Sequence, residues 1–346
     1  MGHPLLLAAL AAALLVATVA HVLFWRWKLS APGREDERLH PVTADGWTLC
    51  LGRRRPRGPP RGPPVLLVPG IAMNRLALDF GVERWSLSAH LSAAGFDCFA
   101  LDLRGHGGAR PGPGAPRDWS LDDYLALDVP AALEATRGAT GAPAVLWVGH
   151  SQGALLGLAA ASRYPARVAG VVALAPPIRL GGLAARFRLL PALARLRVAR
   201  LAARLVAPAS GRWQPGHADL AIRLAEVEPF VYRRMMMNAI EELPAGVVAQ
   251  FRTFSLEDRI GSLDGREDWR EALAACRQPA LFVAAPEDGL APPAAVEEAH
   301  RRWGGEKALW TAPAGVGHTD LVLGRRAPET LFPAVRAWLE AHSTVR

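Results

Sequence analysis

Apolar residues along this chain fall in short runs that alternate with segments of helical periodicity. Runs this short, and this rich in Val, Leu and Ala, are typical of strands buried on both faces of a sheet. The strands that we predict are Val65–Val68, Cys98–Leu103, Ala144–Val148, Val168–Leu174, Ala280–Ala284 and Lys307–Trp310. The helices that we predict around them are Arg84–Ala94, Leu121–Ala135, Ala154–Ala161, Pro293–Trp303 and Glu329–Ala341. This alternation predicts an α/β fold, with a mostly parallel central sheet flanked by helices.

Two further predicted strands precede this pattern. Arg38–Thr43 and Trp47–Arg53 are joined at Asp45-Gly46, a common hairpin turn. The next stretch, Arg53–Pro64, is basic and rich in proline, which argues against both a central strand and a helix. It is either a solvated loop or a patch that faces anionic lipid headgroups.

The first element of the chain, Pro4–Trp25, is apolar apart from Thr18 and His21. At about 1.5 Å per residue it is long enough to cross a hydrocarbon core of about 30 Å. We predict a retained membrane anchor, because no Lys or Arg precedes the apolar run and the run is longer than that of a typical signal peptide. The alternative is a signal peptide that is cleaved near Ala20 before export. Basic residues follow the run and place the rest of the chain on the cytoplasmic side: Arg26, Lys28, Arg34 and Arg38.

The segment from Ile178 to Arg277 interrupts the alternation, because it has helical periodicity but no convincing strand. We predict that it is a helical cap inserted over the carboxyl ends of the strands. The predicted organisation is therefore an N-terminal membrane helix (1–30), a first part of the core (31–177), the cap (178–277) and a second part of the core (278–346).

The first half of this predicted cap is basic and carries no acidic residue before Asp219. On a helix its arginines share one side and its large apolar residues a neighbouring side, with Arg197, Arg200 and Arg204 beside Val198, Leu201 and Leu205. Such a helix lies either on a membrane surface or in an ordinary cap, where its arginines extend along apolar neighbours toward water.

Composition narrows the range of functions. Of the 346 residues 51% are hydrophobic and 21% are charged, which allows a large core and argues against global disorder. The net charge of +8 comes almost wholly from arginine, which fits a GC-rich codon bias. The chain has no zinc-finger spacing, P-loop or RNA-binding pattern, so we predict no nucleic-acid partner. Its three cysteines are far apart in the sequence, which favours free thiols in a reducing compartment.

The predicted strand Ala144–Val148 leads into Gly149-His150-Ser151-Gln152-Gly153, which fits the G-x-S-x-G nucleophile elbow. In such an elbow the serine lies on a strained turn between strand and helix, and the flanking glycines let the two approach closely. We therefore predict that Ser151 is a nucleophile.

A serine hydroxyl is a weak nucleophile that needs a histidine base and an orienting carboxylate. With the chain order Ser, acid, His at strand ends, the predicted triad is Ser151, Asp288 and His318, with Glu287 as the alternative acid. We expect His150 to point away from the reaction and His106 to support the site from a loop near the strand ends.

An oxyanion hole needs two backbone donors. We predict the N–H groups of Gln152, directly after the nucleophile, and of Ile71, in the loop after the first parallel strand. Gly70 in that loop lets the backbone pass close to a substrate. The sequence contains no recognisable metal or dinucleotide motif, so no cofactor and no metal site is predicted.

From about Val65 to its end the chain resembles enzymes of the α/β-hydrolase fold. The matching motifs are Leu67–Ile71, Leu101–Gly107, Gly149–Gly153, Asp288 and His318. Pro69-Gly70, Asn74-Arg75 and Gly317–Leu321 are similar to a branch with lysosomal acid lipase-like enzymes and polyhydroxyalkanoate synthases. The synthases use a cysteine nucleophile, so the resemblance together with Ser151 implies hydrolysis rather than polymerisation.

Together these features predict a serine hydrolase that cleaves a carboxylic ester through an acyl-enzyme intermediate. The apolar cap and the membrane helix favour a lipid-like substrate with a hydrophobic acyl group. Two alternatives stay open, an acyltransferase with the same triad and a non-catalytic, membrane-tethered binding protein of the same fold.

Overall fold

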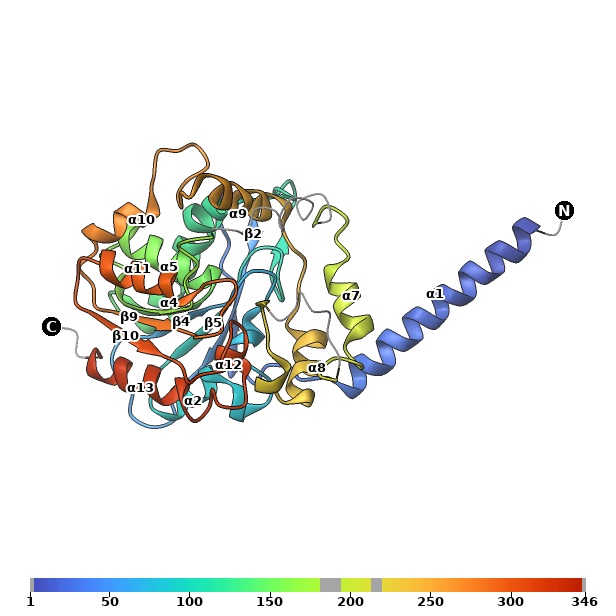
Figure 1. Ribbon diagram of the computed structural model, residues 1–346, viewed down its shortest axis with the longest axis horizontal. Coiled ribbons are helices and arrows are strands. Elements are labelled where there is room, and N and C mark those ends of the chain that lie inside the picture. The colour runs from blue at the N-terminus through green and yellow to red at the C-terminus, as the bar shows by residue number, and fades with distance from the viewer. Residues whose placement is uncertain (1–2, 181–193, 213–219, 344–346) are drawn as a thin grey trace.

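A computed structural model describes residues 3–180, 194–212 and 220–343. An eight-stranded sheet runs through the body of the molecule with helices on both faces, and one long helix projects away from it (Figure 1). In spatial order the strands are β1 (Glu37–Leu39), β3 (Cys50–Arg54), β5 (Cys98–Asp102), β4 (Val65–Val68), β7 (Val145–His150), β8 (Val168–Leu174), β9 (Ala280–Ala284) and β10 (Lys307–Thr311). The strands from β5 to β10 are parallel, and β3 is antiparallel to both of its neighbours, which confirms the mostly parallel sheet.

The sheet has a separate hydrophobic core on each face, because successive strand side chains point to opposite sides. The helices on the two faces are α2 (Leu87–Ala93), α4 (Val129–Thr140), α5 (Gln152–Arg163), α11 (Pro293–Arg302) and α13 (Leu331–Ala341). Leu66 and Val68 of β4 lie in one core with α4, α5 and α11. Val65 and Leu67 lie in the other with α2 and α13. The continuous apolar runs of the sequence therefore reflect burial on both faces.

The predicted helix at Leu121–Ala135 has an irregular start. It begins as α3 (Leu121–Asp123), continues as the π-helical turn η3 (Tyr124–Asp128) and becomes regular in α4. Ser120 and Asp123 form a capping box, in which the Ser120 N–H donates to Asp123 Oδ2 at 2.8 Å.

The predicted hairpin at Arg38–Arg53 is only partly correct. The turn at Asp45-Gly46 is present, since the Thr43 N–H donates to the Trp47 carbonyl at 2.7 Å. The first strand, however, ends at Leu39, and the second divides into β2 (Trp47–Thr48) and β3. β2 pairs with β6 (Arg110–Pro111) in a separate two-stranded sheet, while β3 joins the main sheet beside β5.

The start of the basic stretch Arg53–Pro64 is also part of the main sheet, contrary to prediction. β3 continues through Arg54, which is buried and forms an ion pair with the buried Asp79. Arg53 pairs with Asp97 at 2.7 Å. The carboxylates of Asp79 and Asp97 pair with the two arginines and so allow them to continue a strand inside the sheet. Both aspartates are distant from the arginines in the sequence.

The segment 178–277, here called the insertion, contains helices and no strand among its described residues. They are α7 (Ala199–Val206), α8 (Pro229–Asn238), α9 (Ala245–Glu257) and α10 (Trp269–Ala272), with the 3-10 turns η5 (Leu224–Glu226) and η6 (Leu273–Ala275). The insertion is joined to the body by an isolated antiparallel β-bridge between Ile240 and Met73, which lies in the loop after β4.

The projecting helix is α1 (His3–Lys28). A stretch of 18 residues within Pro4–Lys28 has a mean hydropathy of 2.5 and is not buried. By length and composition it can serve as a membrane anchor or as a signal sequence. Figure 1 shows that it leaves the body beside α7 and α8.

Candidate active site

Ser151 lies on a sharp turn where β7 ends and α5 begins. Its backbone has φ +53° and ψ −118°, a region that costs a non-glycine residue about 1–3 kcal/mol. The turn is held from the neighbouring strand, because the Ser151 N–H donates to the Leu174 carbonyl of β8 at 2.8 Å. The serine therefore has the strained strand-to-helix geometry that the motif predicts.

The two glycines of the motif are required by close backbone contacts. A Cβ on Gly149 would collide with the carbonyl of Gly153, and a Cβ on Gly153 would collide with the carbonyl of Val68 at the end of β4. Gly70, in the next loop, lies so close to the turn that its Cβ would be 3.2 Å from that of Ser151. The elbow is thus packed backbone to backbone against β4 and the loop after it.

Asp288 and His318 meet at the carboxyl ends of β9 and β10. His318 Nδ1 lies 2.6 Å from Asp288 Oδ2, and both residues are buried. Asp288 Oδ1 accepts from the N–H groups of Leu290 and Ala291 at 2.8 and 2.7 Å, which fixes the carboxylate. Because Nδ1–H donates to the carboxylate, His318 Nε2 is left with a free lone pair.

Glu287, the alternative acid, lies outside this contact. Its side chain is 48% exposed, and its carboxylate is 3.7 Å from Arg223. The structure therefore pairs His318 with Asp288 and leaves Glu287 on the surface. Within the described residues Ser151 Oγ has no hydrogen bond, so the Ser–His contact of a triad stays a prediction.

The sequence predicted that His150 points away from the predicted site, and this prediction is wrong. Its ring centroid is 4.8 Å from that of His318, and its Nε2 is 3.1 Å from the His318 carbonyl. Because a carbonyl only accepts, Nε2 carries the proton and donates. Burial, reinforced by the neighbouring His318, lowers the pKa of His150 to about 3. His150 is thus a neutral support for the loop that carries His318.

The two predicted oxyanion donors are available. In the described part of the chain, neither the Ile71 nor the Gln152 N–H donates to a protein acceptor. Gln152 is the first residue of α5, where backbone N–H groups have no partner within the helix and the helix dipole is positive. Ile71 directly follows Gly70, which contacts the serine turn.

Buried ion pairs hold the two loops that follow β4 and β5. Asp102, at the end of β5, accepts from the N–H of Arg75 and pairs with its guanidinium, each at 2.7 Å. Arg104 pairs with the buried Asp128 at 2.7 Å and with Asp45 at 2.7 Å. The motif Leu101–Gly107 therefore serves to fix loop positions, a role that sequence reasoning missed because the partners are far apart along the chain.

Two side chains beside these loops are buried without hydrogen-bond partners among the described residues. Both ring nitrogens of His106 and both amide atoms of Gln152 are unpartnered. Burial lowers the pKa of His106, so its ring is neutral at physiological pH. Of these two residues Gln152 directly follows the proposed nucleophile, while His106 lies in the loop after β5.

The insertion contacts two of the loops that carry predicted site residues, those of Ile71 and His318. The Thr319 N–H donates to the Ala221 carbonyl at 2.8 Å. Glu241 accepts from the Asn74 amide at 2.8 Å and from the Gly107 N–H at 3.1 Å. Residues of the insertion thus lie beside the loops after β4, β5 and β10.

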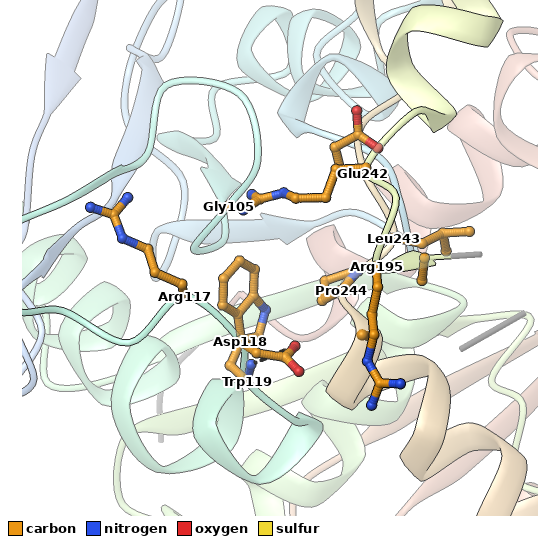
Figure 2. A pocket seen from close by; sticks show the side chains of 11 residues that line it. Gly105, Arg117, Asp118, Trp119, Arg195, Glu242, Leu243 and Pro244 are labelled. Carbon is orange, nitrogen blue, oxygen red and sulfur yellow. Dashed lines mark hydrogen bonds between the residues drawn. The ribbon is translucent and has the colours of Figure 1, made fainter. Parts of the chain in front are cut away.

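A cavity of about 160 Å³ lies between the insertion and the loop after β5 (Figure 2). Its lining includes Gly105, Trp119 and Glu242 and none of the predicted triad residues. Figure 2 shows that Arg117 and Arg195 point in opposite directions, so the arginines do not converge on one ligand position. In the described ranges no group of three His, Cys, Asp or Glu residues could hold a metal ion.

Comparison with known proteins agrees with this fold. The sequence profile of the alpha/beta hydrolase fold family matches residues 63–324. The chain therefore belongs to this family.

Individual relatives are more distant. Lysosomal acid lipase/cholesteryl ester hydrolase of Macaca fascicularis is 31% identical over 42% of this chain and 40% of its own length. The first curated relatives are thus matched over less than half of their length. Pimeloyl-[acyl-carrier protein] methyl ester esterase of Xanthomonas campestris is 29% identical over 75% of this chain and 92% of the relative.

Among solved structures, a soluble variant of monoglyceride lipase from Saccharomyces cerevisiae in complex with a substrate analogue has a TM-score of 0.61. It is 19% identical and the match covers 92% of this chain and 100% of that chain. At this identity the likeness concerns the fold.

The elbow contacts predict the stability of a glycine variant. Gly153→Ala should lower the free energy of unfolding by about 1–3 kcal/mol, because the new methyl group meets the Val68 carbonyl. The control is Gly138→Ala in α4, where a Cβ would meet no atom of the described residues within 4 Å. This substitution should stabilise the chain by about 0.5–1 kcal/mol. Thermal unfolding measures both, and equal changes would contradict the packing described here.

His150 predicts a pH dependence of stability. The unfolded chain takes up a proton at His150 below about pH 6.5, while the folded chain does so only near its lowered pKa of about 3. Stability is therefore lost as the pH falls, by about 2 kcal/mol near pH 5 from this group. Denaturant unfolding of His150→Gln should show a shallower pH slope than the wild type. The exposed His40→Gln should keep the wild-type slope, and an unchanged slope in His150→Gln would exclude this role.

Proposed function

We propose that this protein is a serine hydrolase that cleaves carboxylic esters. The observation that carries the proposal is the buried hydrogen bond between His318 and Asp288, beside a serine on a strained turn. The names of its relatives, which are esterases and lipases, support the same reaction class. The free lone pair on His318 Nε2 is the base that such a reaction needs.

In the proposed reaction Ser151 Oγ attacks the ester carbonyl while His318 Nε2 takes the hydroxyl proton. The N–H groups of Ile71 and Gln152 stabilise the negative charge on the former carbonyl oxygen. The intermediate collapses, the C–O bond to the alcohol breaks, and His318 returns the proton to the leaving alcohol. Water then attacks the acyl-enzyme by the same route, which releases the acid and restores Ser151. Asp288 keeps the imidazole in the tautomer and orientation that this sequence requires.

We infer further that the substrate is lipid-like, with a hydrophobic acyl group, and that the insertion is a cap over the site. The relative named for cholesteryl ester hydrolysis supports the substrate class. The contacts of Ala221 and Glu241 with the site loops support the cap. A cap of this kind would exclude water from the acyl group and set its length.

We also propose that α1 is a retained membrane anchor and that the body lies on the cytoplasmic side. Arg26 and Lys28 at its last turn favour this orientation. The three cysteines are free and buried, which fits a reducing compartment.

The first test of this reaction is Ser151→Ala with a p-nitrophenyl ester as substrate. The variant should lose about 10⁶-fold in kcat, because the nucleophile is absent, with little change in folding. Ser88→Ala is the matched control, since Ser88 is also buried and its hydroxyl has no partner among the described residues. Full activity in Ser151→Ala would contradict the proposal.

A second test separates the two neighbouring acids. Asp288→Asn should lower kcat by about 10⁴-fold, because an amide no longer holds His318 in the required tautomer. Glu287→Gln should remain close to wild type, since its carboxylate faces Arg223 at the surface. Steady-state kinetics of both variants measures the difference, and the reverse order of losses would assign the acid to Glu287.

A further inference from the structure

The region of α7 exposes its large apolar side chains and buries small ones. Ala203 and Ala207 are buried. The exposed residues are Leu196 at 63%, Val198 at 50%, Leu201 at 47%, Leu205 at 37% and Val206 at 47%. On a helix that faces water, the large apolar side chains are normally buried and the small ones exposed. A run of exposed large apolar residues therefore marks a surface that contacts something apolar.

This surface is joined to the candidate membrane helix. His21 Nε2 lies 3.3 Å from the Leu205 carbonyl. The half-buried residues of α1 share one face near its end, with Thr18, Val22 and Trp25 at helical spacing. Figure 1 shows α7 and α1 diverging from a common point.

The position of this contact along α1 sets the depth of α7. His21 precedes Lys28 by about 10 Å along the helix axis at 1.5 Å per residue. If α1 is embedded up to its terminal basic residues, a helix that contacts it at His21 lies at the level of the interface. Interfacial helices are buried about 5–10 Å into the boundary between headgroups and acyl chains, which is the same range.

Positive charge collects at the same junction, where acidic residues neutralise only part of it. Arg200 pairs with Glu241 at 3.2 Å, and Glu242 accepts from the backbone N–H of Ala199 at 3.0 Å. Within the described residues, Arg26, Arg197 and Arg204 form no ion pair. The Nε of Arg204 is buried and has no hydrogen-bond partner in the described part of the chain. Burial and repulsion from Arg200 and Arg26 lower the pKa of Arg204, so an anion placed here would relieve the unpaired charge.

We propose that α7 lies in the interface of the bilayer that holds α1, and that Arg26, Arg200 and Arg204 bind the phosphate of an anionic phospholipid there. The exposed apolar side chains enter the acyl region, and the guanidinium groups reach the headgroups. Phosphate suits arginine because the guanidinium can donate two parallel hydrogen bonds. This docking goes beyond the proposed hydrolysis and does not depend on it, although it rests on the proposal that α1 is a retained membrane anchor.

Glu241 connects this surface to the predicted active site. Its Oε2 accepts from Arg200 of α7 at 3.2 Å, and its Oε1 accepts from Asn74 in the loop after β4. Glu241 itself is buried. Through Glu241, α7 is therefore connected by one side chain to the loop that holds a predicted oxyanion donor.

The test places an environment-sensitive NBD fluorophore on the full chain, reconstituted through α1 into vesicles of phosphatidylcholine, with or without phosphatidylglycerol. Leu201→Cys carries the label in α7, and Leu309→Cys in β10 is the control, because Leu309 is also exposed and β10 lies across the body from α1 (Figure 1). The native cysteines are buried and should not be labelled. Brominated lipids should quench the label at position 201, with blue-shifted emission, and should not quench it at position 309.

The arginines are tested in the same assay, without reference to catalysis. Arg204→Gln should lower the ratio of embedded to water-exposed label by about fivefold in phosphatidylglycerol vesicles and leave it unchanged in pure phosphatidylcholine. The exposed Arg301→Gln is the matched control and should change neither ratio. Raising the salt concentration on the wild type should reproduce the loss without any substitution.

Three results would overturn the proposal. If the label at position 201 reports water in both kinds of vesicle, α7 does not lie in the interface. A blue shift without bromine quenching would assign the surface to another protein segment or a second copy. Equal quenching with and without phosphatidylglycerol would contradict the proposed phosphate-binding site.

Discussion

The backbone contact between the serine turn and β4 is the constraint on which the rest of this structure depends. Gly153 lies against the Val68 carbonyl and Gly149 against Gly153 itself, so strand, turn and helix meet with no room for a side chain. This contact holds Ser151 at a positive φ that an isolated peptide would leave. It also brings Gly70, and with it the loop of Ile71, beside the serine. The proposed nucleophile and oxyanion donors thus follow from one packing arrangement.

The remaining site loops are held by buried polar contacts rather than by apolar packing. Asp102 and Arg75 join the loops after β4 and β5, and Asp288 holds His318 at the ends of β9 and β10. Breaking one partner of such a pair leaves a buried charge, which costs several kcal/mol. These pairs therefore favour one arrangement of loops over others. Glu241 extends the same principle to the insertion, because it accepts from both Arg200 and Asn74.

The sequence was most informative where structure is local. Strand runs such as Val65–Val68 and the glycine spacing around Ser151 are set by neighbouring residues, and the structure confirms the parallel sheet that they predict. Prediction failed at Arg54, whose strand depends on the distant Asp79, and at His150, whose orientation depends on the loop of His318. No short-range pattern reports such partners. The predictions for residues 181–193 and 213–219 concern positions outside the described residues.

The central claim is that Ser151 is the reactive nucleophile of an ester hydrolase. Labelling the full chain with a fluorophosphonate, followed by mass spectrometry of its peptides, tests this most directly. The account predicts one covalent adduct, on the peptide that contains Ser151, and loss of ester hydrolysis in proportion to labelling. An adduct on another residue, or hydrolysis that continues after complete labelling of Ser151, would contradict it.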